Sequence, residues 1–114
     1  MNTSSINTIQ NINMTELYPH TEIKALIASN PIVVFGKGEQ GQPMCGFTAK
    51  VQNVFEDLDL EYAMVNILKD SDLRAEMKTF SDWPTFPQVY LNGEFIGGCD
   101  IVLEMHENGQ FIVE

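Results

Sequence analysis

The sequence predicts an α/β fold in which a mixed four-stranded sheet is flanked by helices. Short apolar runs rich in β-branched residues alternate with segments whose apolar residues recur at helical spacing. Near the end of the chain, two β-rich runs flank Asn92-Gly93, a dipeptide typical of tight hairpin turns. A strand–helix–strand unit implies a parallel pair joined by a right-handed crossover, and the hairpin adds antiparallel strands.

The N-terminal part divides into a polar segment and the first predicted elements. Positions 1–18 are rich in Asn, Ser and Thr, which predicts a flexible tail ahead of a single domain over residues 19–114. Residues 21–30 have apolar side chains at helical spacing and end at an Asn-Pro pair, which predicts a short helix. Residues 31–35 (PIVVF) are typical of a strand buried on both faces.

A glycine-containing loop over residues 36–44 leads to the second predicted helix, which begins near Cys45. Its expected apolar face consists of Phe47, Val51, Val54, Phe55 and Leu58. Residues 61–67 (EYAMVNI) predict a second strand.

The C-terminal part completes the predicted fold. Residues 70–80 form the next expected helix, with Asp70 or Ser71 as its N-cap. The hairpin spans residues 87–98, and a final helix over residues 99–109 has Asp100 as its expected N-cap. This order of elements is the thioredoxin-like arrangement.

Charge and composition narrow the expected partners and compartment. The net charge is −10, from 6 basic and 16 acidic residues, which disfavours nucleic acid and acidic membranes as partners. The first twenty residues contain no Lys or Arg and no continuous apolar run, unlike a signal peptide or a mitochondrial presequence. Two cysteines in such a chain fit a reducing compartment. We therefore expect a cytoplasmic protein with no nucleic-acid and no membrane partner.

Cys45 is the main candidate for chemistry. Unpaired backbone N–H groups and the dipole at a helix N-terminus stabilise an anion and lower the pKa of a thiol, and Lys37 on the preceding loop would add positive charge. The alternative is a buried structural cysteine, but the neighbouring Pro43 and Gly46 favour a helix terminus. Thr48 stands where a dithiol protein would have its second cysteine, and a hydroxyl cannot resolve a mixed disulfide at neutral pH. Dithiol exchange is therefore excluded.

The glycines of the loop formally match a nucleotide-binding motif. Residues 36–41 (GKGEQG) fit G-x-G-x-x-G directly after a predicted strand. In a dinucleotide site the third glycine lies inside the following helix, whereas here Gln42 and Pro43 intervene. The sequence therefore favours a mobile loop beside the thiol.

The segment WPTFPQV is the second candidate part of the site. Pro87 begins a predicted strand, and a cis Phe86–Pro87 bond would turn the backbone of Thr85 and Phe86 toward the start of the Cys45 helix. An ordinary trans turn is the alternative. Trp83 is either a core residue or a wall of the site.

The segment GGCDIV is the third candidate part of the site. Gly97 and Gly98 permit a close approach of the backbone, and Asp100 opens a helix whose N–H groups would bind a carboxylate. Cys99 is either a second ligand or a small buried residue, and the residue type favours burial.

Other ionisable residues are less informative. Arg74 taken alone is a solvated charge, but together with Lys37 it would hold an anionic ligand beside the thiol. His20 and His106 match no spaced metal motif and receive no role.

Together these segments resemble a known family. KGEQGQPMCGFT, WPTFPQVYLNGEFIGGCDI and their spacing are similar to the monothiol glutaredoxins of the Cys-Gly-Phe-Ser type, in their single-domain form. The resemblance implies a thioredoxin fold, glutathione binding and a homodimer bridged by a [2Fe–2S] cluster. It also implies transfer of that cluster to apo iron–sulfur acceptor proteins, and pairing with a BolA-like protein.

The resemblance assigns roles by position. Cys45 would be the cluster ligand and the thiol that forms a mixed disulfide with glutathione. The glutathione site would consist of Lys37, Arg74, Trp83, Thr85, Phe86, Pro87, Gly98, Cys99 and Asp100. Lys37 and Arg74 would hold the glycine carboxylate, and Asp100 would face the γ-glutamyl amino group. The family usually has Ser at the position of Thr48, so its additional methyl would crowd the cluster or change its lability.

Counting ligands gives a reason for a single cysteine. A [2Fe–2S] centre generally takes four sulfur ligands, and two chains that each contribute Cys45 and one glutathione would supply them. The alternative is a glutathione-dependent monothiol oxidoreductase, weak at most, that removes glutathione from protein thiols; a redox-inert adaptor is a third. Two questions about Cys99 stay open: whether it ligates iron in place of glutathione, and whether it forms a disulfide with Cys45.

Overall fold

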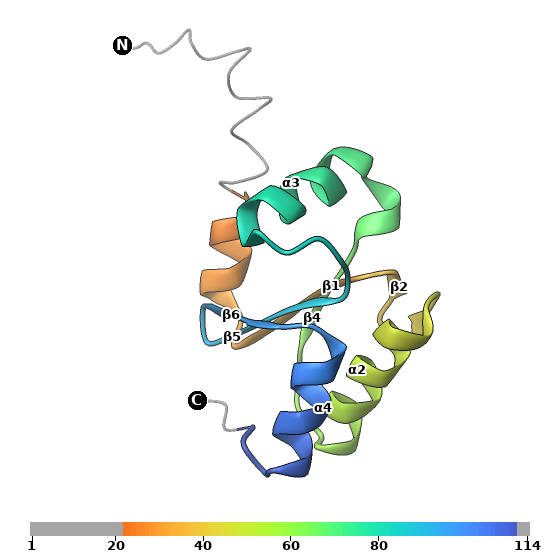
Figure 1. Ribbon diagram of the computed structural model, residues 1–114, viewed down its shortest axis with the longest axis vertical. Coiled ribbons are helices and arrows are strands. Elements are labelled where there is room, and N and C mark those ends of the chain that lie inside the picture. Colours follow the sequence, from red (N-terminus) through yellow and green to blue (C-terminus); the bar gives the residue numbers. More distant parts are fainter. Residues whose placement is uncertain (1–21, 112–114) are drawn as a thin grey trace, which may run out of the picture.

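A four-stranded sheet forms the centre of the computed structural model, which describes residues 22–111 (Figure 1). The strand order is β4-β1-β5-β6, with bounds Ala63–Asn66, Ile32–Gly36, Gln88–Leu91 and Glu94–Gly97. β1 pairs parallel with β4 and antiparallel with β5, and β5 pairs antiparallel with β6. The predicted mixed thioredoxin-like sheet is therefore confirmed.

Helices cover both faces of this sheet. α2 (Gly46–Asp57) and α4 (Cys99–Glu107) lie on one face, whereas α3 (Ser71–Ser81) and the helical residues 22–29 lie on the other (Figure 1). No helix in the described part of the chain is long and apolar enough to cross a membrane. The predicted tail over residues 1–18 lies outside the described residues.

β1 joins the two halves of the core. All five of its residues are buried, as the sequence predicts. Ile32 and Val34 pack with α2 and α4, whereas Val33 and Phe35 pack in the cluster on the α3 side. This alternation follows from the two-residue period of a strand and explains why the segment has no polar side chain.

The predicted N-cap residue is correct for α3 and wrong for α4. The Asp70 carboxylate caps α3 by accepting hydrogen bonds from the N–H groups of Asp72 (3.0 Å) and Leu73 (3.1 Å), as expected. The expectation that Asp100 caps α4 is wrong, because Gly98 occupies the N-cap position and Asp100 lies in the first turn. The helix therefore begins earlier than its polar residue suggests.

Two residues that the sequence analysis placed on the apolar face of α2 are exposed in the structure. Val51, Val54 and Phe55 are buried, but Phe47 is 56% exposed and Leu58 is 39% exposed. Phe47 lies in the first turn and Leu58 is the C-cap, so the apolar face extends past the region that the sheet and α4 cover.

The loop over residues 36–44 contains a small hairpin that the sequence analysis missed. β2 (Gly38–Glu39) pairs antiparallel with β3 (Gln42–Pro43). By contrast, the expected hairpin turn between β5 and β6 is confirmed, since Asn92 and Gly93 have φ values of 50° and 88°, as a type I′ turn requires. Between β4 and α3 the chain forms the 3₁₀ helix η1 (Ile67–Lys69).

Candidate functional site

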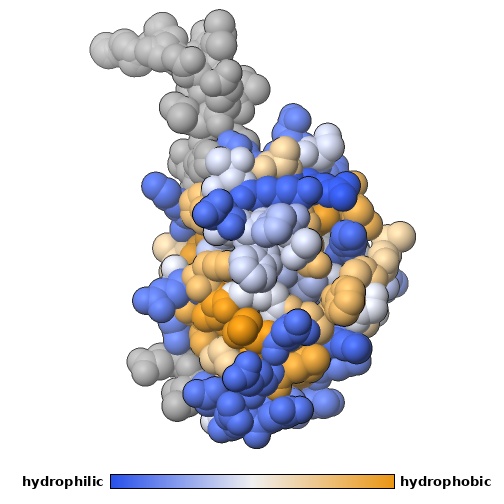
Figure 2. Space-filling view, in the orientation of Figure 1, coloured by the Kyte–Doolittle hydropathy of each residue, from blue (hydrophilic) through white to orange (hydrophobic). Residues whose placement is uncertain are grey.

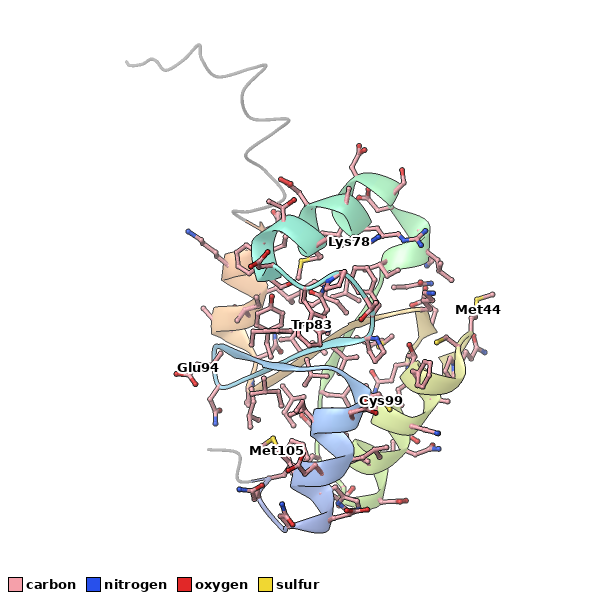
Figure 3. All side chains as sticks on the ribbon, viewed as in Figure 1. Met44, Lys78, Trp83, Glu94, Cys99 and Met105 are labelled. Carbon is pink, nitrogen blue, oxygen red and sulfur yellow. The ribbon has the colours of Figure 1, made fainter. Side chains whose placement is uncertain are left out.

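A cavity of about 690 Å³ lies where the first turns of α2 and α4 meet α3 and the loop before β5. In Figure 3, Lys78 lies on α3 above Trp83, and Cys99 lies below Trp83 at the start of α4. Every residue that the sequence analysis assigned to the site lines this cavity: Lys37, Cys45, Arg74, Trp83, Thr85, Phe86, Pro87, Gly98, Cys99 and Asp100. The fold therefore brings together three sequence segments and a helix that are far apart in the chain.

Cys45 occupies the N-cap position of α2, in an extended backbone conformation. Partial burial acts to raise the pKa of its thiol. The N–H groups of Thr48 and Phe47, followed by the Thr48 hydroxyl and the charge of Lys37, favour the thiolate and leave the pKa of the thiol below its ordinary value. The predicted position of Cys45 at the start of a helix is therefore confirmed.

Thr48 connects the thiol to the preceding loop. Its side chain is fully buried, and its Oγ1 accepts a hydrogen bond from the Lys37 N–H at 3.2 Å while the hydroxyl stabilises the Cys45 thiolate. A Cβ added to Gly36 would lie 3.1 Å from the Thr48 Cγ2 and 3.2 Å from the Met64 methyl group. The Thr48 methyl is therefore accommodated against β1, and Thr48 does not line the cavity.

One side of the cavity is cationic. Lys37 comes from the loop after β1, and Arg74 comes from α3. The sequence analysis missed a third cation, Lys78, which also lines the cavity. Residues four apart on a helix share a face, so the spacing from Arg74 to Lys78 was the available signal. Asp100 lines the same cavity from α4, which gives the site both signs of charge.

The Trp-Pro segment forms another wall. The Phe86–Pro87 peptide bond is cis, which decides between the two alternatives that the sequence left open. Trp83 is 39% exposed and its ring centroid lies 5.7 Å from that of Phe95, so it is a wall residue that also contacts the core. Phe47, Pro84 and Ile101 complete the lining; they belong to the candidate segments, but the sequence analysis assigned none of them an individual role.

Cys99 differs from Cys45 in its environment. It is buried, and burial raises the pKa of its thiol; the charge of Lys50 opposes this, whereas Asp100 and Cys45 add to it. Both cysteines are free thiols, and the interpretation of Cys99 as a buried residue is confirmed. No cluster of three or more His, Cys, Asp or Glu side chains that could hold a metal occurs within residues 22–111.

Large apolar side chains surround the cavity at the protein surface. Phe47, Trp83 and Ile101 line the cavity and are each more than a third exposed, and Met44, beside Cys45, is 71% exposed. Figure 2 shows apolar residues at the surface on this side of the molecule, next to hydrophilic ones. A thiolate in such surroundings is accessible to another molecule.

Sequence comparison identifies the family to which this fold and site correspond. The glutaredoxin family profile matches residues 32–96, which is more than half of the chain. The chain belongs to the glutaredoxin family. The probable monothiol glutaredoxin 2 of Rickettsia typhi is 48% identical to this glutaredoxin over 88 residues, covering 77% of the chain and 79% of the relative.

Solved glutaredoxin structures have the same fold. Reduced apo GrxS14 of poplar is 41% identical and superimposes with a TM-score of 0.71, covering 80% of this chain and 84% of the poplar chain. A buckwheat glutaredoxin in complex with glutathione is 29% identical, with a TM-score of 0.73 and 88% of each chain covered.

Proposed function

We propose that this chain is a monothiol glutaredoxin that binds glutathione and carries a [2Fe–2S] cluster between two copies of itself for delivery to apo acceptor proteins. The main support is the combination of one thiol of lowered pKa, Cys45, with a second cysteine that is buried and has a raised pKa. Both cysteines line the cavity, but only Cys45 is partly exposed, so one chain would offer a single sulfur ligand there.

The cavity suits glutathione in size and charge. Its volume falls within the usual range of small-molecule sites, about 300–1,000 Å³. Glutathione has two carboxylates and one amino group. Lys37, Arg74 and Lys78 offer cations for a carboxylate, and Asp100 offers an anion for the amino group. The buckwheat relative forms a complex with glutathione, which supports the same ligand here.

Sulfur counting then supports sharing of the cluster. A [2Fe–2S] centre generally takes four sulfur ligands. Cys45 and the thiol of a bound glutathione supply two of them, so a second chain with its own glutathione completes the set. The exposed Met44 and Phe47 beside Cys45 give the second chain an apolar surface to contact. A BolA-like protein would replace one of the two chains.

Anaerobic reconstitution with iron, sulfide and glutathione tests this proposal. We expect a coloured dimer, measured by visible absorption and sedimentation, that does not form with Cys45→Ser or without glutathione. Cys99→Ser is the control and should retain the cluster. A colourless monomer would contradict the proposal, and loss of the cluster in Cys99→Ser would indicate that protein thiolates replace glutathione.

The lowered pKa of Cys45 also favours a second candidate, a glutathione-dependent oxidoreductase. The Cys45 thiolate would attack the glutathione sulfur of a mixed disulfide and release the protein thiol. A second glutathione would then regenerate Cys45 and leave as oxidised glutathione. Turnover of a glutathionylated peptide that requires Cys45, without a stable cluster after reconstitution, would favour this function over cluster transfer.

A further inference from the structure

Gln88 lies directly behind the Trp-Pro wall of the cavity and is fully buried. Its Nε2 donates one hydrogen bond to the Trp83 carbonyl oxygen at 3.0 Å and another to the Thr85 carbonyl oxygen at 3.2 Å. One side chain on β5 thus holds the preceding loop at two points.

The held loop has contacts on its other sides as well. The Trp83 N–H donates to the Ser81 Oγ at 3.2 Å, so the backbone of Trp83 is fixed at both its N–H and its carbonyl group. A Cβ added to Gly98 would lie 3.0 Å from the Pro87 carbonyl oxygen, so the loop packs closely against the segment that starts α4. A displacement of this loop would therefore change the shape of the cavity.

The side-chain amide of Gln88 includes a group that lowers the stability of the fold. Its Oε1 is buried and has no hydrogen-bond partner in the described part of the chain. An unpaired buried carbonyl destabilises a fold, whereas an apolar side chain of similar length would avoid that penalty. The two hydrogen bonds that the Nε2 group donates to the loop explain why a side-chain amide occupies this buried position.

We propose that Gln88 is a positioning residue that holds Trp83 and Thr85 in the arrangement the cavity needs to bind its ligand. The hydrogen bonds of Gln88 fix the wall whatever the ligand is, and the identification of that ligand as glutathione rests on the proposed function.

Gln52 provides a matched control in the same protein. It is also buried, on α2, and its Nε2 donates to the Glu39 carbonyl oxygen at 3.1 Å while its Oε1 accepts from the Gly41 N–H at 3.1 Å. Gln52 therefore holds the β2–β3 hairpin, not the loop that contains Trp83. Methionine has a side chain of similar length to glutamine but no amide group. Replacing either glutamine by methionine therefore removes its buried side-chain hydrogen bonds.

The experiment compares Gln88→Met with Gln52→Met, using the fluorescence of Trp83, the only tryptophan in the chain. We expect Gln88→Met to shift Trp83 emission to longer wavelength and to increase its quenching by acrylamide, while Gln52→Met leaves both unchanged. Glutathione affinity should fall about two- to tenfold in Gln88→Met, as expected for the loss of one or two ordered hydrogen bonds. Circular dichroism and urea titration check that both variants are folded.

Wild-type Trp83 fluorescence in a folded Gln88→Met variant would overturn the proposal, as would equal changes in both variants. If Gln88→Met does not fold, hydrogen exchange measured by NMR in the wild-type protein tests whether Gln88 makes these hydrogen bonds. Side-chain amide protons of Gln88 should exchange with water far more slowly than those of the exposed Gln110, and equal rates would overturn the proposal. If the wild-type protein binds no glutathione, the proposed function fails, but the Trp83 measurements still decide the role of Gln88.

Discussion

Among single residues, Thr48 has the most direct effect on the chemistry of the site. Its hydroxyl group accepts a hydrogen bond from the Lys37 N–H and stabilises the Cys45 thiolate. Its methyl group lies next to Gly36, which has no side chain to occupy that space. A threonine can therefore act as the hydroxyl donor here without projecting its methyl group into the cavity.

Replacing Thr48 with valine should separate these two contributions. Valine keeps the shape but removes the hydroxyl, so we expect the pKa of Cys45 to rise, because its thiolate loses one hydrogen bond. The partly buried Lys37 N–H also loses its acceptor, at a cost of about 1 kcal/mol in the free energy of unfolding. Thiolate ultraviolet absorbance against pH and urea titration measure both effects. Thr48→Ser, which keeps the hydroxyl, should show neither; an unchanged thiol pKa in Thr48→Val would contradict this role.

The lowered pKa of Cys45 also makes stability depend on pH. In the folded state Cys45 releases its proton at lower pH than in the unfolded chain, whose thiol pKa is about 8.5. Its contribution to stability is therefore complete above that unfolded value and is lost as the pH falls through the folded pKa. We expect the difference in urea midpoint between wild type and Cys45→Ser to grow as the pH rises through this window. A constant difference would show that the pKa is the same in both states.

At the scale of secondary-structure elements, the β2–β3 hairpin determines how Lys37 and Cys45 are presented at its two ends. Gln52 holds the turn of this hairpin from α2, and the Asn66 Oδ1 accepts a hydrogen bond from the Gly38 N–H at 3.0 Å. The Met44 N–H then donates to the Lys37 carbonyl oxygen at 2.8 Å, which closes the segment just before the thiol. Hydrogen bonds therefore tie this loop to α2 and β4, whereas the sequence favoured a mobile loop.

Two glycines of this hairpin should respond differently to alanine. Both have positive φ, but a Cβ on Gly38 would collide with the Gln42 carbonyl oxygen and lie 2.7 Å from the Met44 nitrogen, whereas a Cβ on Gly41 meets nothing within 4 Å. We expect Gly38→Ala to destabilise the protein by about 2–4 kcal/mol, and Gly41→Ala by about 1 kcal/mol from backbone conformation alone. Urea titration of the two variants measures the difference. Equal losses would mean that the hairpin does not pack as described.

The elements also show what the sequence could and could not predict. β1, the Asp70 cap and the Asn92-Gly93 turn were predictable because each has a local signature, in burial period, cap chemistry or turn propensity. The β2–β3 hairpin was missed because its strands are two residues each and one contains proline. Lys78 was missed although it lies four residues after Arg74 on α3, because that spacing places the two cations on one face of the helix but does not show that this face borders the cavity.

Over the whole molecule, the charge distribution is uneven. The chain has 16 acidic and 6 basic residues, yet three of the basic ones, Lys37, Arg74 and Lys78, line a single cavity. The excess acidic side chains repel one another in the folded state, while the cavity offers local positive charge to an anionic ligand. Added salt screens both effects.

Raising ionic strength should therefore change stability and binding in opposite directions. We expect sodium chloride to raise the melting temperature, since it reduces repulsion among excess acidic groups, and to weaken glutathione binding about two- to fivefold, as for exposed ion pairs. Calorimetry and a binding titration over the same salt series measure the two. A Lys24→Gln variant, altered on the helical residues 22–29 away from the cavity, should keep the same salt dependence of binding. Binding that salt does not affect would contradict a role for the cationic wall.

The contrast between the two cysteines has a practical use. Cys45 is partly exposed and ionises readily, whereas Cys99 is buried and holds its proton. A maleimide dye or spin label at neutral pH will therefore attach at one sulfur per chain without any engineered cysteine. Because that sulfur lines the cavity, such a probe reports from the site itself whenever another protein approaches it.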